Sequence, residues 1–135
     1  MSKDTGPEIG SRQIDRVLEF LPAFESPGYR FGEWGDSGYF SYSPEVDDFI
    51  KTLYEQDILV AFDWMGWKEE AQRYQSEIGA LQQADLLTLR KLLTAHVRAD
   101  RFTEGHLASV LESGHITAIL GRLKQIRDQM SHGGG

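Results

Sequence analysis

The chain has 135 residues, a length that suits one domain able to bury a core without covalent staples. Cysteine is absent, which excludes disulfides, thiolate metal sites and a cysteine nucleophile, and favours a reducing, cytoplasmic location. No stretch approaches the roughly 20 apolar residues that span a bilayer, and the N-terminal segment lacks the apolar run of a signal peptide. We therefore expect neither membrane insertion nor secretion.

The formal net charge of −7 disfavours general binding to nucleic acid or anionic membranes, because both partners repel an acidic surface. The charge is unevenly distributed: residues 1–85 carry 17 acidic and 7 basic side chains, whereas residues 86–135 carry 4 acidic and 7 basic ones. This asymmetry indicates either an anion-facing surface in the second part or attraction between the two parts within one fold. We favour the attraction within one fold.

Both ends of the chain are polar and contain glycine, so they bury little apolar area. We assign residues 1–10 and 131–135 as disordered tails, and residues 11–130 as a single helical domain. From the start of that domain, apolar residues recur at helical spacing until Pro22, which disfavours helix at the residue before it. The first helix is therefore expected to end near Leu21.

Glycines and aromatic residues are dense between Glu25 and Ser43, which predicts a loop or a short hairpin near residues 29–42. Ser43 and Pro44 then have the residue types of an N-cap and a first helical position, and acidic residues follow in the first turn. They predict a helix. The apolar face of this helix comprises Val46, Phe49, Ile50, Leu53 and Tyr54.

The run Ile58–Phe62 is β-capable but short, and it suits either a lone strand or the lead into the next helix. Apolar residues at steps of three and four then predict one helix from Trp64 onward, with Asp63 as its cap. Its stripe comprises Trp67, Ala71, Tyr74, Ile78 and Leu81. Since Trp64 and Trp67 lie on this stripe, we expect both in the core.

Three further helices are predicted after this stripe. Asp85 is the expected N-cap of a helix over residues 86–98, and Thr103 the expected N-cap of a short helix that Gly114 terminates. An amphipathic last helix follows, with basic residues toward its C-terminal end, where cations suit the helix dipole. Its apolar residues are Ile116, Ile119, Leu120, Leu123 and Met130, and its basic residues are Arg122, Lys124 and Arg127.

Four features of residues 89–123 stand out. They are a helix with Leu93 and Thr94, the sequence RADRF at 98–102, the pair Glu104 and Gly105, and the helix GHITAILGRL at 114–123. These features resemble a family of small bacterial domains of unknown function, and Phe62–Trp64 with Trp67 is similar to the middle portion of that family. The resemblance spans residues 40–125 and implies one domain there, but it implies no chemistry.

A dense polar corner lies between two of the predicted helices and comprises Arg98, Asp100, Arg101, Glu104 and His106. Two arginines this close suit bidentate binding of a phosphate or carboxylate. The alternative is a structural role, in which Arg101 holds loop carbonyls or pairs with Glu104 while Asp100 or Thr103 caps the next helix. We favour the structural role, and keep Arg98, Arg101, Glu104 and His106 as candidate binding residues.

The candidate metal ligands are His96, His106, His115, Glu104 and Glu112. Their spacing matches no metal motif: there is no His-Glu-x-x-His, and the single Glu-x-x-His at residues 112–115 is interrupted by Gly114. His96 also shares a helix face with leucines, which favours a histidine in the core. We assign no metal and no cofactor.

Aromatic residues in a glycine-bearing loop suit the lining of a pocket or peptide groove, because rings supply large contact area at low entropic cost. The aromatic group comprises Tyr29, Phe31, Trp34, Tyr39, Phe40, Tyr42, Trp64 and Trp67. Trp34 and Tyr39 stand beside Gly35, Asp36 and Gly38, so they are the least committed to a core. These two are the best candidates for a binding surface.

Residues 103–130 permit a helix-turn-helix interpretation, with two helices joined near Gly114 and basic residues on the second. However, Ser113 and His115 flank the turn glycine where apolar residues are expected. The basic residues also cluster late in the helix rather than at its start. Nucleic-acid binding is therefore a lesser alternative.

The sequence has no Gly-x-Ser-x-Gly, Ser-x-x-Lys, Walker or Rossmann glycine pattern. An enzyme would have to use the carboxylates, arginines and histidines of the polar corner, gathered by folding into one concave site. We expect a mainly α fold of five or six helices around one core. The leading function is a non-catalytic domain that binds a protein partner or itself, and a small enzyme and a nucleic-acid binder are the alternatives.

Overall fold

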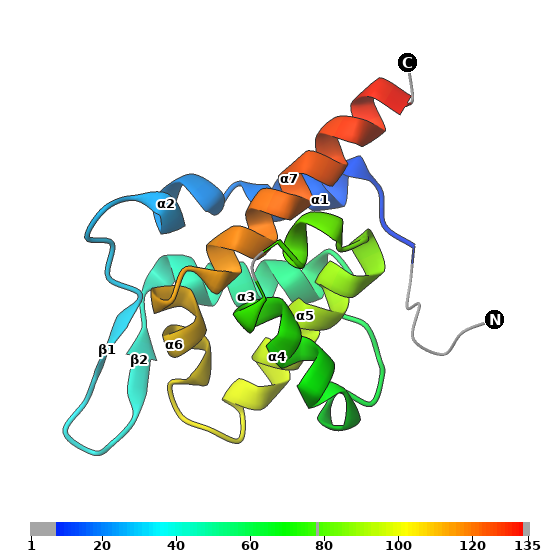
Figure 1. The fold of residues 1–135 in the computed structure, drawn as a ribbon. Coiled ribbons are helices and arrows are strands. Elements are labelled where there is room, and N and C mark those ends of the chain that lie inside the picture. The colour runs from blue at the N-terminus through cyan, green and yellow to red at the C-terminus, as the bar shows by residue number, and fades with distance from the viewer. Residues whose placement is uncertain (1–7, 78, 134–135) are drawn as a thin grey trace.

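The structure, a computed structural model, describes residues 8–77 and 79–133 of the chain (Figure 1). Within these residues the fold is mainly α-helical with one two-stranded antiparallel hairpin, as the sequence predicts. In chain order the elements are α1 (Ser11–Leu18), α2 (Leu21–Glu25), β1 (Gly32–Trp34), β2 (Phe40–Tyr42), α3 (Pro44–Glu55), η1 (Met65–Trp67), α4 (Lys68–Ser76), η2 (Leu81–Gln83), α5 (Leu86–Asp100), α6 (His106–Glu112) and α7 (His115–Gly133), where η marks a 3-10 helix.

The two predicted tails fall partly outside the described part of the chain. Residues 1–7 of the N-terminal tail and residues 134–135 of the C-terminal tail lie outside it. Helix α7 continues beyond Met130 to Gly133, further than the sequence analysis places the end of the domain. Among the helices that the structure describes, none combines the length and the apolarity that crossing a membrane requires.

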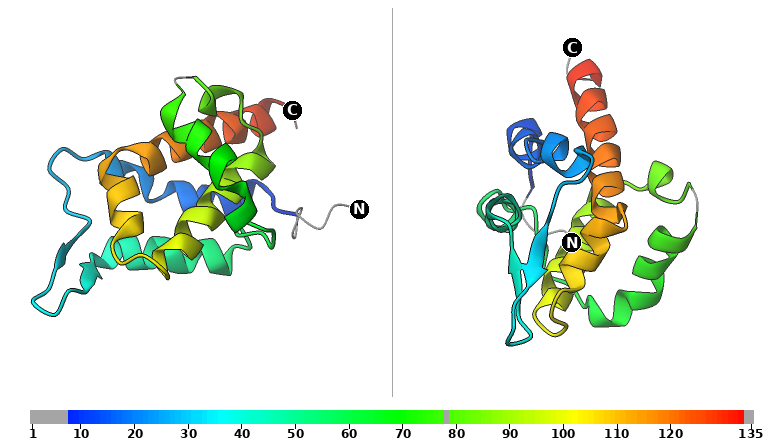
Figure 2. Two further views of the ribbon diagram at one scale, coloured as in Figure 1. Left: turned by 60° about the horizontal axis from the view of Figure 1, so that its bottom comes forward. Right: turned by 90° about the vertical axis from the view of Figure 1, so that its left-hand side faces the viewer.

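Helix α7 lies at the centre of the molecule, with α1 and α2 on one side and α4 and η2 on the other (Figure 2). Ile116, Ile119 and Leu120 of α7 are fully buried, and they join one hydrophobic cluster with Ile14 and Val17 of α1. The same cluster includes apolar residues of α3, α5 and α6. Each fully buried side chain of this kind contributes roughly 1.5–3 kcal/mol relative to its exposed state. One continuous core therefore holds all the helices together.

Three predicted helix ends are confirmed at the level of individual contacts. The Ser43 hydroxyl accepts a hydrogen bond from the Val46 N–H at the start of α3, at 3.4 Å. The Asp85 carboxylate accepts one from the Thr88 N–H at the start of α5, at 2.8 Å. Gly114 follows α6 with a φ of 86°, the left-handed conformation that stops a helix.

The first predicted helix is wrong in its extent. The chain forms two helices there, because α1 ends at Leu18 and α2 begins at Leu21. Pro22 lies in the first turn of α2, where a residue without an N–H is tolerated since that N–H would have no intrahelical partner. The proline therefore accompanies a helix start rather than the end of a longer helix.

The single helix predicted from Trp64 to Leu81 is also wrong. Helix α4 ends at Ser76, and Leu81 belongs to the separate η2. The chain leaves the helical conformation at Glu77, whose backbone is extended with a ψ of 119°, and Gly79 then adopts a φ of 89°. The predicted stripe residue Ile78 lies outside the described residues.

The run Ile58–Phe62 forms no strand and leads into η1. Its buried backbone is satisfied by side chains of α5 instead of a second strand. The Val60 N–H donates to the Thr94 hydroxyl at 3.0 Å, and the Ile58 carbonyl accepts from Arg90 Nε at 3.0 Å. Because buried backbone groups need partners, these two side chains fix this segment against α5.

Candidate functional site

The polar corner is spread over neighbouring elements. The Asp100 carboxylate accepts hydrogen bonds from the Tyr42 hydroxyl at 2.6 Å and from the Leu107 N–H at 2.9 Å. Burial and the bond to Asp100 raise the pKa of Tyr42, which keeps its hydroxyl a donor. The expected Thr103 cap is wrong, because the N-cap of α6 is Gly105 and no side chain caps from it. The alternative that Asp100 caps this helix is confirmed.

The other corner residues point to different partners. A carboxylate oxygen of Glu104 accepts from the Phe40 N–H at 2.8 Å and so holds the hairpin against the α5–α6 loop. Arg101 donates to the Tyr54 hydroxyl at 2.8 Å, and the guanidinium of Arg98 lies 5.8 Å from the centre of the same ring. Arg101 thus contacts a side chain of α3 rather than the loop carbonyls or the Glu104 carboxylate that the sequence suggests. These contacts fit the structural role that the sequence analysis favours for the corner.

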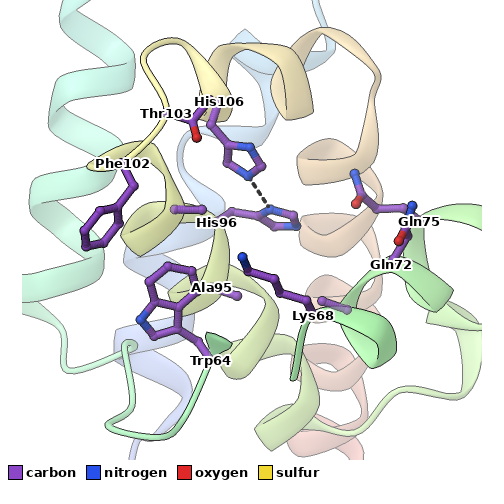
Figure 3. Close-up of a pocket in the computed structure, with 11 residues that line it drawn as sticks. Trp64, Lys68, Gln72, Gln75, Ala95, His96, Phe102, Thr103 and His106 are labelled. Carbon is purple, nitrogen blue, oxygen red and sulfur yellow. Dashed lines mark hydrogen bonds between the residues drawn. The ribbon is translucent and has the colours of Figure 1, made fainter. Parts of the chain in front are cut away.

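A pocket of about 280 Å³ lies between α4, the C-terminal half of α5 and the loop that leads to α6 (Figure 3). Ala71, Ala95 and Ala99 line it, and their small side chains leave the space open between the two helices. His106 is the only residue of the polar corner that contributes to the described lining. The pocket is therefore a feature distinct from the corner.

One wall of the pocket is aromatic. The rings of Trp64 and Phe102 lie 5.9 Å apart between centroids, and Phe102 is 72% exposed, so its ring borders the pocket mouth. The expectation that Trp64 and Trp67 lie in the core is wrong for Trp64 and holds only in part for Trp67, since both are half-buried. Trp67 still packs against the core cluster, whereas Trp64 lines the pocket.

The opposite wall is polar. Helix α4 carries Lys68, Gln72 and Gln75 at spacings of four and three, so that they share one helix face and line the pocket. Figure 3 shows the Lys68 side chain extending into the pocket, with its amine directed toward His96. The described lining contains no carboxylate. Lys68 therefore gives this wall a positive charge in an otherwise acidic protein.

Two histidines form the floor. His96 is 4% exposed, and its Nδ1 lies 3.2 Å from Nε2 of His106 (Figure 3). When both rings are neutral, one proton occupies this hydrogen bond. The His96 ring also meets the His115 ring edge-on, with centroids 5.3 Å apart. Nε2 of His96 and Nε2 of His115 are buried without a hydrogen-bond partner in the described part of the chain.

Burial determines the charge of this cluster. It lowers the pKa of His96 to about 3, with the neighbouring imidazoles of His115 and His106 lowering it further, and it lowers the pKa of His115 to about 4. Burial also lowers the pKa of His106, against the attraction of the Asp100 carboxylate. All three rings are therefore neutral at pH 7, and the pocket floor carries no charge.

Three of the five candidate metal ligands, His96, His106 and His115, lie together, but their geometry does not suit a metal ion. Over the residues that the structure describes, no three His, Asp or Glu side chains are placed to hold a metal ion together. Nδ1 of His96 is instead bonded to His106, and Glu104 is bonded to the hairpin backbone.

The predicted binding residues of the hairpin are exposed. Trp34 is 59% and Tyr39 is 66% exposed. The Trp34 ring lies against Gly105, where an added Cβ would come within 2.8 Å of it, and it meets the Phe40 ring edge-on at 5.4 Å. The structure thus brings Trp34 to the loop that also carries Phe102, while Arg98 and Arg101 lie against α3.

The polar wall of the pocket is not among the features predicted from the sequence. Lys68, Gln72 and Gln75 have the residue types of any solvated helix face, and none belongs to a motif. The spacing of these three residues on one helix face, together with the small side chains of Ala95 and Ala99, is consistent with a gap between two packed helices. This pattern indicates a pocket only once α4 and α5 are known to be neighbours.

The comparisons with known proteins give the class of this domain. Residues 9–129 match a family described as a family of unknown function, DUF6508. The chain therefore belongs to this family, and the match extends beyond the residues 40–125 over which the sequence resembles such a family. No curated protein and no solved structure matches the chain.

Proposed function

We propose that this protein is a non-catalytic binding domain whose pocket receives an apolar side chain of a protein partner. The observation that carries the proposal is a pocket of about 280 Å³ beside the exposed ring of Phe102. This volume lies just below the roughly 300–1,000 Å³ typical of sites for drug-sized ligands, so it suits one large side chain. Anchors of this kind supply most of the binding energy in protein interfaces.

The surroundings of the pocket support the same function. Met65 is 53% exposed and follows Trp64 in the chain, and Trp34 lies against the loop that carries Phe102. Tryptophan, phenylalanine and methionine are enriched in interfaces relative to the rest of protein surfaces. We assign these side chains to the rim that excludes water around the anchor.

The charge of the molecule favours a different protein over a second copy as the partner. Two copies with a net charge of −7 repel each other as they approach, which weakens self-association. We also place the protein in the cytoplasm, because a chain without cysteine carries no sign of an oxidising compartment.

The position of His96 supports binding more than general-base catalysis by this ring. A general base must reach within hydrogen-bond distance of the proton that it removes. Nδ1 of His96 is engaged by His106, and Nε2 of His96 is buried from solvent. Neither nitrogen of this ring is free to meet a substrate.

The environment of α7 supports binding of protein over nucleic acid. Arg122 donates to the Ala84 carbonyl at 2.9 Å, and Arg127 donates to the Asp15 carboxylate at 2.7 Å. A recognition helix must instead direct its side chains into a DNA groove. The apolar face of α7 is also central to the core.

An NMR titration tests the proposal. The 15N-labelled full-length protein is titrated with N-acetylated, C-terminally amidated pentapeptides that differ only in a central Gly, Leu, Phe or Trp. We expect the Phe and Trp peptides to shift the amide signals of Ala95, Ala99 and Phe102, and the Gly peptide to leave them in place. No shift at millimolar peptide, or equal shifts with the Gly peptide, would overturn the proposal.

A pocket-filling variant sharpens the test. Ala99→Leu places a larger side chain in the pocket, and it should weaken binding at least about tenfold, since a hot-spot anchor is typically worth more than 1.4 kcal/mol. Ala118→Leu, at an exposed position of α7, is the matched control and should bind as the parent does. Light scattering that shows a dimer blocked by Ala99→Leu would replace the foreign partner by a second copy.

A further inference from the structure

The pocket combines one cation with an apolar wall, and this combination specifies the anchor further. Among its described lining residues, Lys68 is the charged side chain, since His96 and His106 are neutral at pH 7. The amides of Gln72 and Gln75 lie on the same helix face as Lys68. The aromatic wall of Trp64 and Phe102 faces them across the pocket (Figure 3).

We infer that the anchor is the C-terminal residue of the partner chain, a large apolar side chain together with its free α-carboxylate. The inference rests on the proposed function. The apolar side chain packs against Trp64 and the alanines of α5. The carboxylate accepts charge-assisted hydrogen bonds from the Lys68 ammonium and further bonds from the Gln72 and Gln75 amides.

A chain end fits both walls where an internal residue fits only one. An internal Asp or Glu brings a carboxylate without a large apolar surface, whereas an internal Phe or Trp brings the surface without the charge. A C-terminal Phe or Leu carries both on one residue. Capture of a terminal carboxylate is also an established mode of peptide recognition.

The acidity of the protein does not prevent this contact. Surface charges are screened over about 8 Å at physiological ionic strength, so most of the 21 acidic side chains act weakly at the pocket. Lys68 acts there at contact distance, and the described lining holds no carboxylate that would repel an anion. The charge of Lys68 therefore makes the electrostatic interaction with a bound carboxylate attractive.

The experiment compares two peptides, acetyl-Gly-Gly-Gly-Gly-Phe with a free carboxylate and the same peptide as its C-terminal amide. Both are titrated by NMR into the full-length protein, into Lys68→Gln and into Lys51→Gln. Lys51 is an exposed lysine of α3 outside the pocket lining, so it is the matched control. N-acetyl-phenylalanine is titrated as a third ligand that carries the same ring and carboxylate without a chain.

We expect the free acid to bind about tenfold or more tightly than the amide, as a charge-assisted contact implies. Lys68→Gln should abolish that difference, and Lys51→Gln should keep it. Equal binding of acid and amide, with shifts at the pocket, would overturn this inference and leave the proposed function standing. Absence of binding by both peptides would count against both. N-acetyl-phenylalanine binding as tightly as the pentapeptide would replace the chain end by a small aromatic acid.

Discussion

The imidazoles of His96 and His115 are held in apolar surroundings, and this burial lowers the stability of the fold by an amount that depends on pH. Each ring has an Nε2 buried without a hydrogen-bond partner in the described part of the chain. A buried polar group in that condition costs about 1–3 kcal/mol, and a buried charge costs more. This is why burial lowers the pKa of His96 to about 3 and that of His115 to about 4.

We therefore predict that the protein loses stability in mild acid. Unfolded histidine binds a proton near pH 6.5, whereas His96 and His115 do not in the folded state, so the unfolded state binds more protons below that pH. Stability is fully present above pH 6.5 and falls as pH decreases. At 1.36 kcal/mol per pH unit, the loss between pH 6.5 and 5 is about 2 kcal/mol per histidine. Urea unfolding at several pH values from 7 to 5 measures it.

Variants assign this pH dependence to the two rings. His96→Gln and His115→Gln each remove one titrating group, so each should reduce the slope of unfolding free energy against pH. The double variant should keep only the smaller contribution of His106, whose pKa burial also lowers. A parent protein with constant stability from pH 7 to 5 would contradict the prediction. A double variant that keeps the parent slope would do the same.

Asp100 gives a second prediction at this scale. Its carboxylate holds both the Tyr42 hydroxyl and the N–H of Leu107, so Asp100→Ala should lower the free energy of unfolding by about 1–3 kcal/mol. Tyr42→Phe should cost less, and the double variant should lose less than the sum of the two, because the residues share one contact. Asp128→Ala, exposed on α7, is the control and should change stability by under about 0.5 kcal/mol.

Chemical denaturation of the parent, Asp100→Ala, Tyr42→Phe and the double variant provides a double-mutant cycle. Additive effects of Asp100→Ala and Tyr42→Phe would show that the 2.6 Å contact contributes nothing to the fold.

The same residues show what the sequence predicts of this region. The density of polar groups is visible because they are close along the chain, but the partners of Glu104 and Asp100 in the hairpin are set by tertiary packing.

Individual elements show where local sequence suffices. The caps at Ser43 and Asp85 are predictable because each side chain contacts an N–H only three residues further along the chain. The start of α6 is not predictable in this way, since its cap Asp100 lies seven residues before Leu107 and depends on the intervening loop. The single helix expected from Trp64 to Leu81 does not form, because the backbone turns extended at Glu77 and left-handed at Gly79 despite the apolar periodicity.

The left-handed N-cap of α6 yields a prediction at the element scale. Gly105 has a φ of 77°, and a Cβ there would approach the Trp34 ring to 2.8 Å. Gly105→Ala should therefore lower the unfolding free energy by about 1–2 kcal/mol, through backbone strain and displacement of the hairpin. Thermal unfolding monitored by circular dichroism measures the change.

A second glycine substitution, Gly121→Ala, is the control, and it is expected to change stability in the opposite direction. Gly121 lies within α7, and a Cβ there meets nothing within 4 Å, so Gly121→Ala should stabilise the protein by about 1 kcal/mol or slightly less. If both alanine variants shift the melting temperature in the same direction, the account of Gly105 is wrong.

At the scale of the whole molecule, the charge asymmetry of the sequence is accommodated within one fold. Arg127 of α7 forms two hydrogen bonds to the Asp15 carboxylate of α1, at 2.7 and 3.1 Å, across 112 residues of chain. This contact joins the basic second part to the acidic first part, as the favoured interpretation expects. Because both side chains are partly exposed, it contributes little energy compared with the core beneath it.

That core leads to the last prediction. Ile14 of α1 is fully buried and belongs to the same cluster as Leu92 and Val97 of α5, the helix that forms the pocket floor. Ile14→Ala should lower the free energy of unfolding by about 2–5 kcal/mol, although Ile14 does not line the pocket. Because small single domains usually unfold as one cooperative unit, the loss should be global.

Two probes separate a global effect from a local one. Far-ultraviolet circular dichroism follows all helices, whereas tryptophan fluorescence follows Trp34, Trp64 and Trp67 in the hairpin and around η1. In Ile14→Ala both transitions should move to lower urea by the same amount. A fluorescence transition that stays in place while the helical signal moves would mean that the pocket end folds independently of α1. The part of the fold around the pocket would then be a separable unit, and the single continuous core described for this fold would be untenable.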